Sequence, residues 1–218
     1  MASEATVAPY GSWKSPITTD LITGTSISLG QVAVDGTTIY WSEGRPVERG
    51  RYVIVRRTDD GRIEDVTPAP LNARTRVNEY GGGAFVVDRG TVYFSNFADQ
   101  RVYRQRDGEA PSPITPEVDL RYANAVVDRH RGRLIAVRED HTDASREAVN
   151  TLVGLDLEQG GPGDVLVSGH DFYSSPRISS DGARLAWLSW NHPNMPWDGN
   201  ELWAGDVGPD GTIRNCLL

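Results

Sequence analysis

The chain has 218 residues, which fits one large domain or part of a longer protein. It carries 22 Lys and Arg against 30 Asp and Glu, a formal net charge of −8, so it offers no broad basic surface to a nucleic-acid backbone. The 23 Gly and 13 Pro occur beside 38% hydrophobic residues, which is typical of a folded, turn-rich chain. We therefore expect a folded protein with no nucleic-acid partner.

The sequence also lacks the usual features of export and membrane insertion. Residues 1–10 do not contain the basic and apolar stretches of a signal peptide. No apolar run approaches the roughly 18 residues that cross a bilayer. The single cysteine, Cys216, cannot form a disulfide within the chain. These observations predict a cytoplasmic location and no membrane partner.

A turn and strand pattern occurs four times along the chain. In each case a turn with an aspartate and a glycine precedes a short apolar run: Asp35 before residues 38–41, Asp88 before 92–94, Asp128 before 134–137 and Asp181 before 185–188. The four aspartates are 53, 40 and 53 residues apart, near the roughly 40 to 50 residues of a propeller blade. The runs are short and nearly continuous, which predicts strands buried on both faces.

Each unit continues with two further strand segments. The third segments cover residues 52–55, 102–103, 152–155 and 201–203, and the outer ones cover 63–67, 113–115, 165–167 and 212 onward. Four strands joined by Gly, Asp and Pro turns make a blade. Only residues 142–150 could hold a helical turn or two. We predict an all-β fold, a β-propeller of four-stranded blades with about four blades present. Residues 1–30 form an N-terminal segment, and the blades cover approximately 31–70, 76–118, 122–169 and 173–218.

The up-and-down order of strands in a blade predicts where the unusual residues meet. Loops between second and third strands fall at one end of the blades, together with the connections between blades. These loops cover residues 43–46, 96–99, 138–141 and 191–198, and the connections include 78–83, 121–122 and 170–173. They concentrate Arg, Glu, His and aromatic residues on one face. A functional face and an ordinary polar loop surface both fit this composition.

No catalytic or metal motif accompanies this pattern. The sequence contains no Gly-x-Ser-x-Gly nucleophile elbow. The four histidines lie in separate segments without metal-ligand spacing, and Gly81 to Gly83 lack the Lys and Ser or Thr of a phosphate loop. Glu139 and Asp140 are neighbours in a strand, so their side chains point to opposite faces and make a poor acid and base pair. We expect no catalytic residue, no metal and no cofactor.

Five longer motifs indicate which protein family the chain resembles. They are Tyr-Gly-Ser-Trp-Lys-Ser-Pro-Ile at 10–17, Asn-Glu-Tyr-Gly-Gly-Gly at 78–83, Val-Tyr-Phe-Ser-Asn-Phe at 92–97, Val-Arg-Glu-Asp-His at 137–141 and His-Pro-Asn-Met-Pro-Trp-Asp at 192–198. Together they resemble the N-terminal β-propeller of bacterial prolyl oligopeptidase-family serine peptidases, in the acylaminoacyl-peptidase and dipeptidyl-aminopeptidase branch. The resemblance covers nearly the whole chain.

The resemblance implies that the propeller and the catalytic residues belong to separate domains. In that family a propeller of seven or so blades caps a C-terminal α/β-hydrolase domain that carries Ser, Asp and His, so the four blades here correspond to an incomplete propeller. This portion is then expected to screen oligopeptide access and to contribute substrate or interdomain contacts, without being catalytic on its own. The implied partners are a peptide substrate in the complete enzyme and the α/β-hydrolase domain.

The sequence departs from the family pattern at three places. Relatives usually have His at the position of Asn78 and Pro at that of Ser180, and residues 215–218 end within the fourth blade's outer strand. The last departure predicts a truncated product or a fragment. A free-standing four-bladed propeller that binds a protein or ligand is the alternative, because four blades can close a ring.

The candidate site follows from the loop face and the motifs together. We expect the substrate or interdomain contacts among Arg138, Glu139, Asp140, His141, Glu79, Tyr80, His192, Asn194, Trp197 and Asp198. A carboxylate here could hold the α-ammonium of a peptide. We also expect self-association, because the end blades of an open arc would expose apolar faces built from Tyr40 and Trp41 in the first blade and Leu185 and Trp187 in the fourth.

Overall fold

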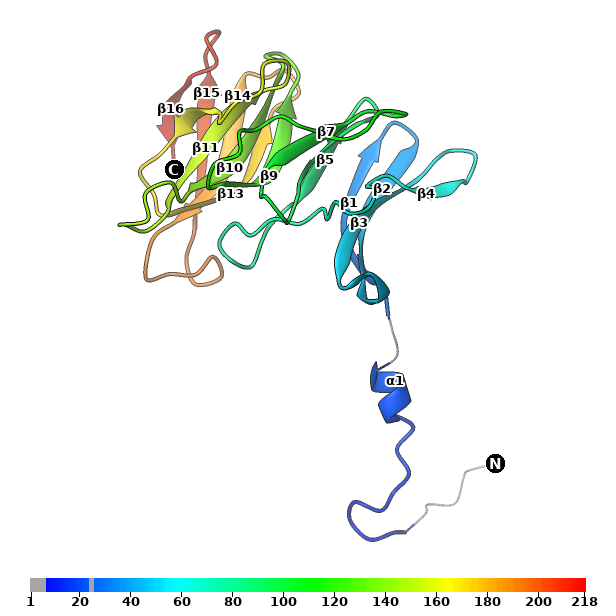
Figure 1. The fold of residues 1–218 in the computed structure, drawn as a ribbon. Helices are drawn as coiled ribbons and strands as arrows, with labels where there is room; N and C mark the ends of the chain where they lie inside the picture. Colours follow the sequence, from blue (N-terminus) through cyan, green and yellow to red (C-terminus); the bar gives the residue numbers. More distant parts are fainter. Residues whose placement is uncertain (1–6, 24–25) are drawn as a thin grey trace.

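Four antiparallel sheets account for nearly all of the regular structure. The computed structural model describes residues 7–23 and 26–218, and Figure 1 shows the sheets side by side. The strands are β1 (Ser28–Asp35), β2 (Thr38–Arg45), β3 (Arg51–Arg57) and β4 (Ile63–Asp65) in blade 1; β5 (Phe85–Asp88), β6 (Thr91–Ser95), β7 (Val102–Gln105) and β8 (Ser112–Pro113) in blade 2; β9 (Leu120–Asp128), β10 (Arg133–Asp140), β11 (Val149–Asp156) and β12 (Asp164–Val167) in blade 3; and β13 (Phe172–Ile178), β14 (Arg184–Trp190), β15 (Glu201–Val207) and β16 (Ile213–Leu217) in blade 4. In every sheet the spatial order of strands is the chain order. The prediction of an all-β chain with four four-stranded blades is confirmed.

The helical content of the described residues is small. A five-residue helix, α1 (Thr19–Thr23), precedes the sheets, and a 3-10 turn, η1 (Pro46–Glu48), joins β2 to β3. Residues 142–148, where the sequence allowed a helical turn or two, form turns and bends instead, and β11 begins at Val149. No helix in the described residues is long and apolar enough to cross a membrane.

The inner strands stack the blades into an open row. β1 packs against β5, β5 against β9, and β9 against β13. Blades 1 and 4 lie at opposite ends of this row in Figure 1. The arrangement is that of a partial propeller, in which each inner blade has two neighbours and each end blade has one.

Strand β10 shows how this stacking uses the sequence. Ile135 and Val137 belong to the core that blade 3 shares with blade 4. Leu134 and Ala136 belong to the core that it shares with blade 2. Successive side chains of a strand point to opposite faces, so a strand between two blades must be apolar at every position. The prediction of a strand buried on both faces is confirmed here.

The exposed faces of the end blades, 1 and 4, are not built from the residues that the sequence predicts. Tyr40, Leu185 and Trp187 are buried, because they lie on the faces that meet the inner blades, and Trp41 is half-buried. The prediction that they form the exposed end faces is therefore wrong for all but Trp41. The following apolar side chains are exposed there instead: Val32, Val34 and Ile39 on blade 1, and Leu202 and Leu217 on blade 4.

The exposed face of blade 1 is continuous across two strands. Val32 pairs with Trp41 and Val34 with Ile39 in the β1 and β2 register. Side chains of directly paired residues share one face of a sheet. Val32 is 64% and Val34 67% exposed, so this apolar strip has no neighbour among the described residues.

We expect the chain to self-associate through this strip. Replacing both Val32→Lys and Val34→Lys should shift the chain toward the monomer at micromolar concentration, because charges oppose the burial of an apolar sheet face. Size-exclusion chromatography with light scattering measures the shift, and an unchanged melting temperature shows that the fold persists.

The matched control is Val47→Lys, because Val47 is 74% exposed but lies in η1 and outside the strip. An association state that responds to Val47→Lys as strongly as to the double variant would contradict the assignment of the contact to blade 1.

Candidate functional site

A cavity of about 710 Å³ opens at the loop end of the blades. This volume lies within the range of roughly 300 to 1,000 Å³ that is usual for ligand sites. Its lining comes from four segments, which are the connection into blade 2, the end of β10 with the loop into β11, the connection into blade 4, and the end of β14 with the loop after it. The lining residues are Asn78, Glu79, Tyr80, Glu139, His141, Arg146, Glu147, Ala148, Val149, Asn150, His170, Asp171, Phe172, Trp190, His192 and Met195.

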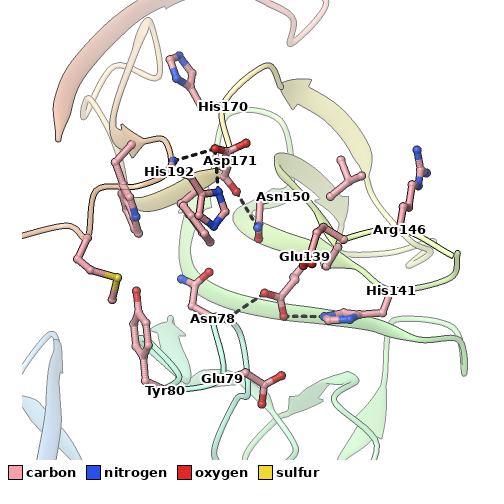
Figure 2. Close-up of a pocket in the computed structure, with 16 residues that line it drawn as sticks. Asn78, Glu79, Tyr80, Glu139, His141, Arg146, Asn150, His170, Asp171 and His192 are labelled. Carbon is pink, nitrogen blue, oxygen red and sulfur yellow. Dashed lines mark hydrogen bonds and ion pairs between the residues drawn. The ribbon is translucent and has the colours of Figure 1, made fainter. Parts of the chain in front are cut away.

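Glu139 lies at the centre of the polar wall. It is the second-last residue of β10 and only 5% exposed. Its Oε1 accepts a hydrogen bond from the backbone N–H of Asn78 at 3.0 Å, and its Oε2 lies 2.8 Å from Nε2 of His141. Figure 2 shows Glu139 between these two residues. Both carboxylate oxygens therefore have partners inside the protein.

Arg121 supplies the positive charge that this buried carboxylate needs. It lies in β9 beside β10 and is itself buried. Its Nη1 is 3.3 Å from Oε2 of Glu139 and 2.6 Å from Oε1 of Glu79, and it also donates to the carbonyl of Arg76. The hydrogen bond from Arg121 lowers the pKa of Glu79. One guanidinium therefore holds two carboxylates of the cavity wall.

The turn that carries Asn78 and Glu79 has an unusual backbone. Asn78 has φ 54° and Glu79 has φ 62°, both in the left-handed region that residues other than Gly seldom adopt. Gly81 follows with φ 88°, and a Cβ at Gly83 would approach Oδ1 of Asn124 to 2.9 Å. The glycine run thus bends the backbone closely past blade 3.

The opposite wall is aromatic. Phe172 stacks on Trp190 with ring centroids 5.4 Å apart and an interplanar angle of 16°. His192 packs on the same Phe172 ring at 4.9 Å. Asp171 accepts from the backbone N–H of His192 at 2.9 Å and lies 3.0 Å from its Nδ1, and these hydrogen bonds lower the pKa of Asp171. The wall therefore combines stacked aromatic rings with the acidic side chain of Asp171.

Five of the ten expected contact residues line this cavity, namely Glu79, Tyr80, Glu139, His141 and His192. Arg138 and Asp140 do not. They alternate with Glu139 along β10, and so they point away from it. Arg138 donates to the carbonyls of Pro162 and Gly163, and Asp140 accepts from Thr142.

The remaining three expected residues belong to the loop after β14 and lie outside the lining. Trp197 is exposed. Asp198 accepts from the backbone N–H of Met195 at 3.0 Å, and the N–H of Asn194 donates to the carbonyl of Asn191. These contacts give the loop its local shape. Met195 is the member of this motif that reaches the cavity together with His192.

Several lining residues were not among the expected contacts, and Asn150 is the most informative. It is directly paired with Glu139 between β10 and β11 and is 5% exposed. Nothing in its sequence neighbourhood distinguishes it from the other asparagines of the chain. Asp171 and Phe172 belong to the connection 170–173, which the predicted topology placed on this face, whereas Trp190 ends β14 just before the predicted loop at 191–198. What the sequence does not show is that His192 and Asp171 are hydrogen-bonded to each other.

The lining combines acidic, histidine and aromatic side chains. It includes no Ser, Thr or Cys among the described residues, so the nucleophiles commonest in acyl transfer are absent from it. Nor do the described residues contain a group of three or more His, Cys, Asp or Glu side chains placed to hold a metal ion. Acidic groups beside an aromatic wall can hold a ligand with a cationic or hydrogen-bond-donating end and an apolar body.

The fold and this site define a partial β-propeller whose loop face carries a ligand-sized cavity. No family model matches the sequence, and no curated protein matches it. Solved structures do match. Puromycin hydrolase is 34% identical with a TM-score of 0.84, and the match covers 98% of this chain and 35% of that one. A puromycin-hydrolyzing peptidase of Mycobacterium tuberculosis is 34% identical with a TM-score of 0.85, and the coverage of each chain is the same.

These matches confirm the resemblance seen in the sequence. The chain matches a propeller portion of the prolyl oligopeptidase-family peptidases, and it spans about 35% of the length of the puromycin hydrolases. A puromycin hydrolase mutant complexed with PGG matches at 34% identity with a TM-score of 0.84, over 96% of this chain and 35% of that one. A prolyl endopeptidase at 15% identity and a TM-score of 0.58 shares the fold.

The buried position of Glu139 leads to a prediction about stability. We expect Glu139→Gln to lower the free energy of unfolding by about 1 to 3 kcal/mol, because the buried Arg121 would lose a charged partner. Glu79→Gln is the matched control. Its side chain is 72% exposed, so we expect a change within about 0.5 kcal/mol. Urea unfolding at neutral pH measures both, and equal losses would contradict a special structural role for Glu139.

Proposed function

We propose that this chain is the propeller portion of a prolyl oligopeptidase-family serine peptidase and that its loop-face cavity receives peptide. In this proposal the chain screens oligopeptide access and contributes contacts to the substrate or to an α/β-hydrolase domain, which performs the catalysis. The proposal places this complete enzyme in the cytoplasm. Its activity is hydrolysis of short peptides or aminoacyl compounds, as an aminopeptidase or acylaminoacyl-peptidase.

The single observation that carries this proposal is the match to the puromycin hydrolases at 34% identity over 98% of the chain. The cavity adds independent support. It lies at the loop end of the blades, its size suits a short peptide, and its walls combine carboxylates with aromatic rings. The PGG complex of a puromycin hydrolase mutant is consistent with a peptide as the ligand class.

The charges around the cavity favour a ligand with a positive end. Glu79, Glu139, Glu147 and Asp171 line it, against Arg146 as the arginine of the lining. A peptide's α-ammonium that enters such a site gains charge-assisted hydrogen bonds, worth about 1.5 to 3 kcal/mol each when desolvated. We therefore propose that a free N-terminal amine is preferred over an acylated one.

A free-standing four-bladed propeller that binds a protein or ligand is the second candidate. A closed ring of four blades would cover both end faces. The exposed apolar strip of blade 1 and the open row of sheets weigh against it. The two candidates differ in their ligand class, because only the first requires short peptides to bind in the cavity.

We expect the 218-residue chain to bind without turnover. Aminoacyl and acyl-aminoacyl chromogenic amides should remain intact in its presence, because the sequence has no nucleophile elbow. A fluorophosphonate probe checks this directly. The proposal that catalysis belongs to another domain would be contradicted if the probe labelled a residue of this chain and substrate turnover co-purified with the labelled chain.

Binding itself can be followed by NMR on the ¹⁵N-labelled chain. A free-amine tripeptide and puromycin, each titrated to millimolar concentration, should shift the amide signals of residues that line the cavity. The N-acetylated tripeptide is the matched control and should shift them less at equal concentration. Shifts confined to other surfaces, or none at all with either ligand, would overturn the proposed function.

A further inference from the structure

Two buried amide oxygens in the cavity wall have no hydrogen-bond partner among the described residues. They are Oδ1 of Asn150 and Oδ1 of Asn78. Both residues line the cavity. A buried acceptor without a donor is costly, so proteins keep such groups mainly where something else supplies the donor.

The orientation of the Asn150 amide follows from its other hydrogen bond. Its Nδ2 donates to the backbone carbonyl of Asp171 at 2.8 Å. A carbonyl oxygen can only accept, so the nitrogen must face Asp171 and the free atom must be the oxygen. Asn150 is 5% exposed, which leaves its oxygen little access to bulk solvent. The unpartnered group is therefore an acceptor by necessity.

The position of this oxygen is set by the sheet. Asn150 and Glu139 are directly paired between β11 and β10, so their side chains share one face of blade 3. Figure 2 shows Asn150 between Asp171 and Glu139. Glu139 is also tied to Asn78 through its backbone N–H. Both asparagines therefore adjoin the buried carboxylate of Glu139, Asn150 through cross-strand pairing and Asn78 through its backbone N–H.

Glu139 and Asn150 differ in what they can offer a ligand. The carboxylate of Glu139 already accepts from Asn78 and contacts His141 and Arg121. Asn150 has a fixed oxygen with no competing donor. A ligand N–H that reaches this oxygen would satisfy it without displacing a donor of the protein.

We propose that Asn150 is a specificity-determining contact of the cavity, whose Oδ1 accepts a hydrogen bond from the N-terminal ammonium of a peptide, with Asn78 Oδ1 as a second acceptor beside it. This inference rests on the proposed function, because it assumes that the cavity receives peptide. It assigns the direct contact to the asparagines. Glu139 contributes the negative charge behind them and holds the turn of Asn78 in place.

The experiment is the NMR titration of the 218-residue chain with the free-amine tripeptide, repeated on three variants. Asn150→Ala removes the acceptor and should weaken binding at least tenfold. Asn150→Asp keeps an acceptor oxygen and adds charge, so it should bind the free-amine peptide at least as tightly as the unmodified chain. A purely structural role predicts the opposite for Asp, because a carboxylate cannot donate to the carbonyl of Asp171.

Asn191→Ala is the matched control. Asn191 accepts from the backbone N–H of Asp171 at 2.8 Å and so supports the same connection, but it does not line the cavity. This variant should bind the peptide within twofold of the unmodified chain. Circular dichroism and melting temperature on all variants identify any loss of fold.

The outcomes separate the two proposals. If the unmodified chain binds no peptide, the proposed function fails and this inference fails with it. If the unmodified chain binds peptide and Asn150→Ala binds equally well, or Asn150→Asp is as weak as Asn150→Ala, the inference alone is overturned. The same holds if Asn191→Ala loses as much affinity as Asn150→Ala, because the effect would then come from the Asp171 connection.

Discussion

The buried carboxylate of Glu139 is the contact on which the loop face depends. It joins the end of β10 to the turn at Asn78 and, through Arg121, to β9. That turn contains two consecutive residues with positive φ, a conformation that costs free energy unless its surroundings hold it. A hydrogen bond from the Asn78 N–H to a carboxylate, with a guanidinium beside it, provides that support. The turn also has backbone hydrogen bonds of its own, from Glu79 N–H to the carbonyl of Arg76 and from Gly81 N–H to that of Val77, and Glu139 ties this turn to blade 3.

The core of the row imposes a second constraint. Strand β10 is covered on both faces by the neighbouring blades, so Leu134 and Ile135 can be neighbours in sequence and belong to different cores. This packing fixes the register of β10, and the register in turn points Glu139 into the cavity and Arg138 away from it. A shift of one residue would exchange their positions. The direction in which Glu139 points therefore follows from the apolar pattern of β10 that precedes it, which includes Ile135 four residues earlier.

Much of the fold and part of the site could be predicted from the sequence, for reasons that differ between residues. The Asp and Gly turns mark strand boundaries locally, so the blades are visible in the chain. The topology then assigns Glu79, Glu139 and His192 to one end. Asn150 could not be found this way, because its significance lies in a hydrogen bond to Asp171 and in its pairing with Glu139, both of which are contacts between distant segments. The same limit explains the error at the end blades, where only the pleat decides that Tyr40 faces inward and Val34 outward.

The exposed apolar strip of blade 1 and the cavity consist of different residues. The lining begins at Asn78 and includes no residue of β1 to β4, whereas the exposed apolar strip consists of Val32, Val34 and Ile39. Covering that strip, whether by another blade or by a second copy, would bury apolar surface without entering the cavity. Ligand contacts made by Asn150 and its neighbours should therefore be preserved when the strip is altered. Because of this separation, the recognition of a ligand by this portion of a propeller can be studied apart from what covers its blade 1 end.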